Sequence, residues 1–285
     1  MSVNNMSTAR KSKPMSITKD GLFYRPQFVN KSDKEIILEW LKTLVPLWEM
    51  RFSKHNPPPE GDEQRQLLRP VYWLGNWQFA CLNYYHPPKG TLNRCVRAED
   101  YPPVLKKILK TIEQIAKVHF KKSDVPEKWK LNTCLINFYG TSIGPDGKRN
   151  DCARVGDHKD FELGPVASIS FGERAFFQFV LGNKNLKNNV LEELWIDDSS
   201  LQMFGGALYK DRAFHRVQRV ENKIKTHFDL QVENFETRRI NFTFRYVPEE
   251  HIVSFRDLPE NLKEDILPYM ETLAKNSEHF QKELK

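Results

Sequence analysis

The sequence lacks long hydrophobic segments: no apolar run approaches the roughly 20 residues that a membrane-spanning helix needs. The first residues, MSVNNMSTARKSKPMS, lack the apolar stretch of a secretory signal. Cysteine is scarce, and no C-x-x-C pair occurs among Cys81, Cys95, Cys134 and Cys152, which argues against a zinc finger or a thioredoxin-type centre. We therefore expect a soluble intracellular protein with free thiols, cytoplasmic or, in a eukaryote, nuclear.

No internal repeat is visible, and the composition is that of a globular protein. Of the 285 residues, 39% are hydrophobic and 12% aromatic, which supplies enough apolar material for a sizeable core. The formal net charge is +7. A basic surface attracts polyanions and makes nucleic acid a natural partner, although many soluble proteins carry such a charge without that role.

The first half of the chain predicts a tail and two helices. Residues 1–20 are polar and basic and are expected to form a disordered tail. Ser32 and Glu35 have the spacing of a capping box, and an apolar stripe follows until Pro46. A second amphipathic helix is expected at about 103–118.

The second half predicts a β-rich core. Short apolar runs separated by Gly, Asn and Asp predict strands at 133–139, 166–171, 175–181, 190–196, 201–204 and 239–247. Many short strands without intervening helices favour an antiparallel sandwich or jelly roll. A helical stretch after residue 258, interrupted by Pro268, closes the chain. The expected α+β organisation is an N-terminal α/β extension (21–129), a β core (130–248) and a C-terminal helical segment (249–285).

A histidine and a carboxylate lie two residues apart in the segment GDHKDFELG. On an extended strand, His158 and Asp160 project from the same face. A third ligand would complete a set of two histidines and one carboxylate, which holds iron(II) and leaves three positions open for cosubstrate and oxygen. His215, 57 residues further on, is the candidate. The alternative is an unrelated pair in a surface loop.

The segment RINFTFRY predicts a strand with two different faces. Period-2 alternation places Ile240, Phe242, Phe244 and Tyr246 on an apolar face, and Arg239, Asn241, Thr243 and Arg245 on the other. Arginines on an inner face are costly to bury unless an anion meets them. The two arginine Cα atoms would lie roughly 20 Å apart, so both ends of a dicarboxylate such as 2-oxoglutarate would suit them. The alternative is a polar outer face with surface arginines.

Together these residues resemble the AlkB family of iron(II)/2-oxoglutarate dioxygenases, whose signature is H-x-D, a distant His and R-x-N-x-T-x-R. Here it reads His158-Lys159-Asp160, His215 and RINFTFR. The segments GPVASISFGERAFFQF and FGGALYKDRAFHRVQ are also similar to family segments, and Asn137-Phe138-Tyr139 matches the N-x-Y that precedes H-x-D. The resemblance covers about residues 130–247 and implies a double-stranded β-helix (jelly-roll) core.

The resemblance implies a role for each matched residue. His158, Asp160 and His215 would hold Fe(II). Arg239, helped by Tyr139, would bind the far carboxylate of 2-oxoglutarate, and the cosubstrate pocket near the metal would be completed by Asn137, Asn241 and Arg245. The implied reaction consumes O2, hydroxylates an N-methyl group on a DNA or RNA base, and releases formaldehyde, succinate and CO2.

Substrate contacts are expected from the region that the family uses as a lid, here about residues 70–90. Reaching a methylated base requires a single strand or an extruded nucleotide, held by aromatic stacking and cationic contacts to phosphate. Stacking candidates are Tyr72, Trp73 and Trp77, with core aromatics as the alternative. Glu162 either accepts a hydrogen bond from an exocyclic amine or is a solvated loop carboxylate. Candidate phosphate contacts are Lys159 and its neighbours Lys148, Arg149 and Arg154.

Two departures from the family accompany these matches. The interval at 216–238 is longer than in the bacterial prototype, and the N-terminal region matches poorly. One alternative function is a dioxygenase of the same fold acting on a protein or small molecule. Another is a nucleic-acid-binding module with an inactive iron site, against which the intact ligand set argues. We expect a monomer that acts on nucleic acid.

Overall fold

The computed structural model describes residues 15–55, 58, 60, 66–82, 84, 95–182, 189–218 and 228–285. The predictions for residues 1–14, for a third of the expected lid (83 and 85–90) and for residues 219–227 of the long interval lie outside the described residues. Among the helices in the described ranges, none has the length and apolar character needed to cross a membrane.

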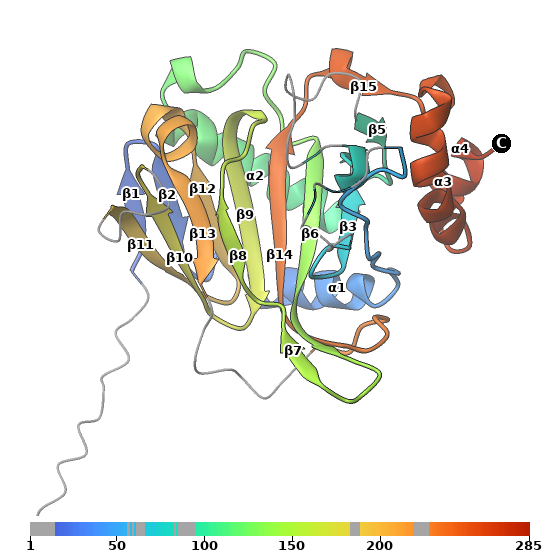
Figure 1. Ribbon diagram of the computed structural model, residues 1–285. Coiled ribbons are helices and arrows are strands. Elements are labelled where there is room, and N and C mark those ends of the chain that lie inside the picture. Colours follow the sequence, from blue (N-terminus) through green and yellow to red (C-terminus); the bar gives the residue numbers. More distant parts are fainter. Residues whose placement is uncertain are drawn as a thin grey trace, which may run out of the picture.

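Two antiparallel sheets dominate the fold (Figure 1). The larger has the order β1-β2-β12-β9-β14-β6-β3, with β7 paired to β6. Its strands are β1 (Ile17–Lys19), β2 (Leu22–Arg25), β3 (Val71–Leu74), β6 (Thr133–Ile143), β7 (Arg149–Asp151), β9 (Leu163–Gly172), β12 (Ser200–Phe204) and β14 (Phe235–Tyr246).

The smaller sheet has the order β11-β10-β13-β8. Its strands are β8 (Val155–His158), β10 (Ala175–Val180), β11 (Val190–Ile196) and β13 (Phe214–Gln218). A third sheet of three short strands joins β4 (Asn76–Trp77), β5 (Cys95–Arg97) and β15 (Ile252–Val253). The α+β architecture with an antiparallel jelly-roll core, expected from the short strands, is confirmed.

Strand β14 lies inside the larger sheet, between β6 and β9, and its two faces meet different surroundings. Ile240, Phe242 and Phe244 are fully buried in one hydrophobic cluster with residues of two helices, α1 (Lys31–Leu41) and α2 (Pro103–His119). The alternate side chains therefore project from the opposite face. The predicted alternation along β14 is confirmed.

Helix α1 begins earlier than the capping-box spacing indicated. Asn30 is the N-cap, and its side-chain oxygen accepts a hydrogen bond of 2.9 Å from the backbone N–H of Asp33. Ser32 therefore lies in the first turn, and the Ser32–Glu35 prediction is wrong, because an asparagine two residues earlier already satisfies a free N–H. The helix also ends at Leu41, short of Pro46.

The C-terminal helix α3 (Glu260–Ala274) continues through Pro268 and is followed by α4 (Glu278–Glu283). The predicted interruption is therefore wrong. Proline removes a hydrogen bond to the carbonyl four residues earlier. Here Glu264 and Pro268 both lie on the exposed side, where water can meet that carbonyl, while Ile266 and Met270 are fully buried on the other.

The N-terminal extension shares its sheet with the core. Strands β1, β2 and β3 come from residues 17–74 and pair directly or through neighbours with β6, β9 and β14. The sequence boundary near residue 130 is therefore not a boundary between separate folding units. Because Ile17–Lys19 pairs with β2, ordered structure also begins before residue 21.

Candidate active site

The three expected metal ligands meet at the edge of the smaller sheet. His158 is the last residue of β8, and it pairs directly with His215 on the neighbouring strand β13. The two imidazole ring centroids lie 4.1 Å apart. Asp160 follows just after β8, so it lies beyond the strand on which we had placed it. One potential ligand atom from each of the three residues lies within 4.8 Å of the others.

Asp160 is held by two cationic side chains. Arg245 of β14 donates a hydrogen bond from Nε to Oδ1 at 2.9 Å, and its Nη2 forms an ion pair with the same oxygen at 2.7 Å. The buried Lys210 donates from Nζ to the Asp160 main-chain carbonyl at 3.0 Å. Oδ2 is buried and accepts no hydrogen bond from the described residues, so it is available to a cation. Burial alone would raise the pKa of Asp160, but the charge of Arg245 above all keeps that pKa below its ordinary value.

Both histidines are arranged to serve as neutral ligands. Nδ1 of His158 lies 2.9 Å from the carbonyl oxygen of Gly156, which can only accept, so Nδ1 carries the proton and the lone pair on Nε2 would be available to a metal. His215 is packed by aromatic rings, with the ring centroids of Phe204 and Phe177 at 4.9 and 5.6 Å. Burial, and then the neighbouring His158, lower the pKa of His215, which favours the uncharged imidazole.

The inner face of β14 carries a buried guanidinium with unused donors. Nη2 of Arg239 donates to Ser170 Oγ and to Asn241 Oδ1, each at 3.1 Å. Nε and Nη1 are buried and have no hydrogen-bond partner among the described residues. The guanidinium carbon lies 4.7 Å from the ring centroid of Tyr139, on the adjacent strand β6. Burial lowers the pKa of Arg239, so an anion at this position would offset a real desolvation cost.

These features fit an iron ion and a dicarboxylate. The ion would meet two neutral imidazoles and a carboxylate oxygen that no hydrogen bond occupies, a donor set suited to non-haem iron(II). The dicarboxylate would meet the unused N–H groups of Arg239. The structure thus brings His158, Asp160 and His215 together with Arg245. It pairs Tyr139 and Asn137 of β6 with Arg239 and Asn241 of β14.

Comparison with known proteins gives the same assignment. The sequence matches the model of the 2OG-Fe(II) oxygenase superfamily over residues 21–245. The chain belongs to this superfamily. Membership implies iron(II), 2-oxoglutarate and O2 as cofactor and cosubstrates, and it makes the protein a dioxygenase.

Solved structures show the shared fold. The structure of OsALKBH1 aligns with a TM-score of 0.52 and 20% identity, covering 82% of this chain and 100% of that one, which confirms the AlkB-type fold. YcfD, a ribosomal oxygenase from Escherichia coli solved with cobalt and succinic acid, aligns with a TM-score of 0.34 and 10% identity. That alignment covers 92% of this chain and 66% of the other. No curated protein sequence matches.

The aromatic residues expected to stack on a base lie in the core of this oxygenase. Tyr72, Trp73 and Trp77 are at most 3% exposed. Nε1 of both tryptophans donates to the same oxygen of the buried Glu49 at 2.8 Å, and the Tyr72 hydroxyl donates to Glu99 at 2.6 Å. These rings offer no face to a substrate, and the stacking role is corrected to a structural one.

Glu162 is buried rather than solvated. It is 3% exposed, Oε1 accepts a hydrogen bond of 2.8 Å from Gln78, and Oε2 lies 3.5 Å from Nε of Arg245. Arg245 therefore stands between two carboxylates, Asp160 and Glu162. The alternative of a solvated loop carboxylate is wrong. A direct contact of Glu162 with a base remains a proposal.

The basic residues near the site differ in their partners. Lys159 donates from Nζ to the carbonyl of Asp211 at 2.6 Å and lies 4.6 Å from the Phe214 ring centroid. Arg149 forms an ion pair with Glu236, so its charge is already compensated. Lys148 and Arg154 are exposed.

Sequence reasoning missed three polar side chains at the site. Arg69 donates from Nε to Asn137 Oδ1 at 2.9 Å, Lys210 holds the Asp160 backbone, and Gln78 holds Glu162. None of them belongs to a recognisable motif. Lys210 lies in a π-helical turn, Ala207–Arg212, a feature often found at functional sites but not readable from this sequence.

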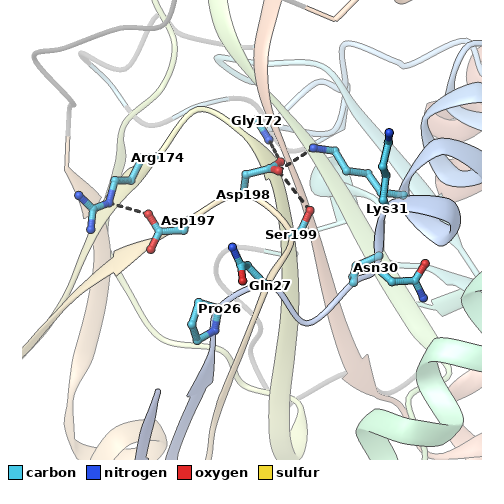
Figure 2. Close-up of a pocket in the computed structure, with 11 residues that line it drawn as sticks. Pro26, Gln27, Asn30, Lys31, Gly172, Arg174, Asp197, Asp198 and Ser199 are labelled. Carbon is cyan, nitrogen blue, oxygen red and sulfur yellow. Dashed lines mark hydrogen bonds and ion pairs between the residues drawn. The ribbon is translucent and has the colours of Figure 1, made fainter. Parts of the chain in front are cut away.

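A separate surface cleft of about 650 Å³ lies beside α1 (Figure 2). It is lined by Pro26, Gln27, Val29, Asn30, Lys31, Lys34, Gly172, Arg174, Asp197, Asp198 and Ser199. Its charges are already paired: Lys34 with Asp198 at 2.6 Å and Arg174 with Asp197 at 2.7 Å. This cleft contains none of the expected metal or cosubstrate residues, so it is distinct from the active site.

Proposed function

We propose that this oxygenase oxidatively demethylates N-alkylated bases in DNA or RNA. The observation that carries the proposal is the arrangement of the His158–Asp160–His215 cluster against a strand bearing the R-x-N-x-T-x-R pattern of the AlkB family. The AlkB-type fold and the net charge of +7 support a nucleic-acid substrate.

When bound, iron(II) and 2-oxoglutarate supply the oxidising chemistry that hydroxylates an N-methyl group. The side chains of the pocket bind and orient the cosubstrate. Arg239 and Tyr139 would hold its far carboxylate, while Asn137, Asn241 and Arg245 complete the end near the metal. Arg245 also keeps Asp160 ionised and fixed in orientation. The rings of Phe177 and Phe204 exclude water from the side of His215.

The direct test is turnover of defined oligonucleotides. Purified protein with iron(II), ascorbate and 2-oxoglutarate is incubated with oligonucleotides carrying 1-methyladenine or 3-methylcytosine, and formaldehyde and the repaired base are measured. We expect repair by the wild type, loss of repair in His158→Ala, and full activity in the control His55→Ala, an exposed residue paired with Glu264.

Two results would contradict the proposal. Turnover of 2-oxoglutarate with every methylated oligonucleotide unchanged would indicate a protein or small-molecule substrate. Oligonucleotide binding without any turnover of 2-oxoglutarate would indicate a binding module with an inactive iron site.

A further inference from the structure

Tyr139 lies between two guanidiniums in register across the larger sheet. On one side, Arg239 of β14 is its direct cross-strand partner. On the other, β3 pairs Val71 with Asn137, and Phe138 donates its N–H to the Pro70 carbonyl at 3.1 Å, which brings the preceding residue, Arg69, alongside Tyr139. The guanidinium carbons of Arg69 and Arg239 lie 4.8 and 4.7 Å from the Tyr139 ring centroid.

Arg69 also fixes the orientation of the Asn137 amide. Its Nε donates to Oδ1 of Asn137 at 2.9 Å. An asparagine amide can present either its oxygen or its NH2 group, but arginine has donors only. The oxygen of Asn137 must therefore face Arg69, and the NH2 group becomes the donor side of the amide. A carboxylate ligand accepts hydrogen bonds and needs that NH2 group.

The charges around Tyr139 leave positive charge in excess. Arg245 is matched by Asp160 and Glu162, and Arg238 by Glu173 and Asp151. No carboxylate in the described part of the chain forms an ion pair with Arg69 or Arg239. Burial lowers the pKa of Arg239, and the nearby charge of Arg69 lowers it further, so the two cations repel each other until an anion is present.

We propose that Arg69 is a positioning residue of the cosubstrate pocket, which orients Asn137 and Tyr139 to receive the carboxylates of 2-oxoglutarate. This inference rests on the proposed role of Asn137, Tyr139 and Arg239 as cosubstrate ligands. It adds Arg69, which lies two residues before β3, to the two arginines of β14, Arg239 and Arg245, that were already assigned to the pocket.

The test measures cosubstrate binding rather than turnover. The iron(II)-loaded protein, without oxygen, is titrated with 2-oxoglutarate, and the visible charge-transfer band of the complex gives the Kd. We expect Arg69→Met to raise the Kd for 2-oxoglutarate about tenfold, the loss of one charge-assisted hydrogen bond, with unchanged affinity for iron. Arg97→Met, which removes an exposed arginine of β5, is the matched control and should bind as the wild type does.

A double variant separates positioning from a contact of Arg69 with the ligand. If Arg69 acts through Asn137 and Tyr139, the loss of affinity for 2-oxoglutarate in Arg69→Met combined with Asn137→Ala should be smaller than the product of the two single losses. If the increase in Kd for the double variant equals the product of the two single increases, the proposal is overturned. So would wild-type affinity for 2-oxoglutarate in Arg69→Met, including the case in which only oligonucleotide binding weakens.

Arg239→Met distinguishes failure of this inference from failure of the pocket itself. If Arg239→Met binds 2-oxoglutarate normally, the assigned pocket is wrong. If it loses binding while Arg69→Met does not, only the role of Arg69 is wrong. Should Arg69→Met not fold, Arg69→Lys decides, because lysine keeps the charge but lacks the planar group over Tyr139. We expect its Kd to rise at least about threefold, and wild-type affinity would overturn the proposal.

Discussion

Arg245 holds one oxygen of Asp160, Oδ1, through a hydrogen bond from Nε at 2.9 Å and an ion pair from Nη2 at 2.7 Å, and the other oxygen, Oδ2, accepts no hydrogen bond from the described residues. One side chain thus fixes which carboxylate oxygen points towards the metal position. The same arginine lies 3.5 Å from Glu162, whose other oxygen is held by Gln78. The candidate metal-binding carboxylate of Asp160 is therefore one end of a buried chain of polar contacts that runs through Arg245 and Glu162 to Gln78, just after β4.

Replacing Arg245 with methionine should weaken iron binding. The change removes the hydrogen bond and the ion pair to Asp160 and leaves two buried carboxylates, Asp160 and Glu162, without their cation. Loss of such a supporting partner costs roughly 10- to 100-fold in metal affinity. Competition for iron(II) with a chromophoric chelator, without oxygen, measures the effect. Arg97→Met is the control, and equal iron affinities in the two variants would contradict the expectation.

Ser170→Ala should affect the cosubstrate and not the metal. The hydroxyl of Ser170 donates to Asn241 at 2.6 Å and accepts from Arg239 at 3.1 Å, so its loss removes one hydrogen bond from each group. We expect the KM for 2-oxoglutarate to rise about fivefold, the value of one hydrogen bond, with little change in kcat. Ser200→Ala removes the buried serine directly opposite on β12 and should leave this KM unchanged. A fall in kcat alone for Ser170→Ala would contradict the assignment.

Glu49 should make stability depend on pH. Burial raises its pKa to about 7, although three N–H donors, from Trp73, Trp77 and Ala80, oppose the shift. Because the folded state then binds the proton more tightly than the unfolded chain, the contribution of Glu49 to stability is fully present below the unfolded pKa. It is lost as the pH rises towards 7.

The measurement is the free energy of unfolding of the metal-free protein at several pH values, compared with Glu49→Gln. Relative to this variant, the wild type should lose on the order of 3 kcal/mol between pH 4.5 and pH 7.5. The exposed Glu39→Gln on α1 should show no such difference. A difference in unfolding free energy between wild type and Glu49→Gln that stays constant across this pH range would refute the prediction.

Trp77→Phe should reduce stability without reducing affinity for oligonucleotides. The ring of Trp77 is fully buried, lies 4.2 Å from the Phe79 centroid, and donates to Glu49. The variant removes that hydrogen bond and part of the ring, and we expect a loss of about 1–3 kcal/mol in unfolding free energy. Denaturant unfolding and oligonucleotide binding are measured in parallel. Weaker binding at unchanged stability would restore the stacking role.

The sequence predicted the parts of the site whose pattern is local. His158 and Asp160 are two residues apart, and Arg239 and Arg245 lie on one strand, β14, whose apolar face packs against a helix layer. The resemblance to the AlkB family then indicated that the H-x-D motif, His215 and the RINFTFR strand belong to one site. Residues that act alone on a distant partner, such as Arg69 on Asn137 and Lys210 on Asp160, leave no such pattern.

The aromatic segment at 71–79 shows why the remaining assignments failed. Its composition suits either a base-stacking surface or a core, and the deciding partner is Glu49, which lies 24 residues before Trp73 and 28 before Trp77. No local spacing predicts that pairing. The predicted start of α1 was wrong for a more local reason. Two residues that can cap a helix, Asn30 and Ser32, lie within one turn, and the structure uses Asn30.

Strand β8 is the outer strand of the smaller sheet, and its ladder with β13 consists of two residue pairs, His158 with His215 and Val155 with Val217. A slip of one residue would turn one imidazole away from the other. An ion bound by both histidines would therefore stabilise the native register between β8 and β13. Iron binding and the pairing of β8 with β13 would then be coupled. When iron is removed, we expect β8 to be the first strand of the jelly roll to detach.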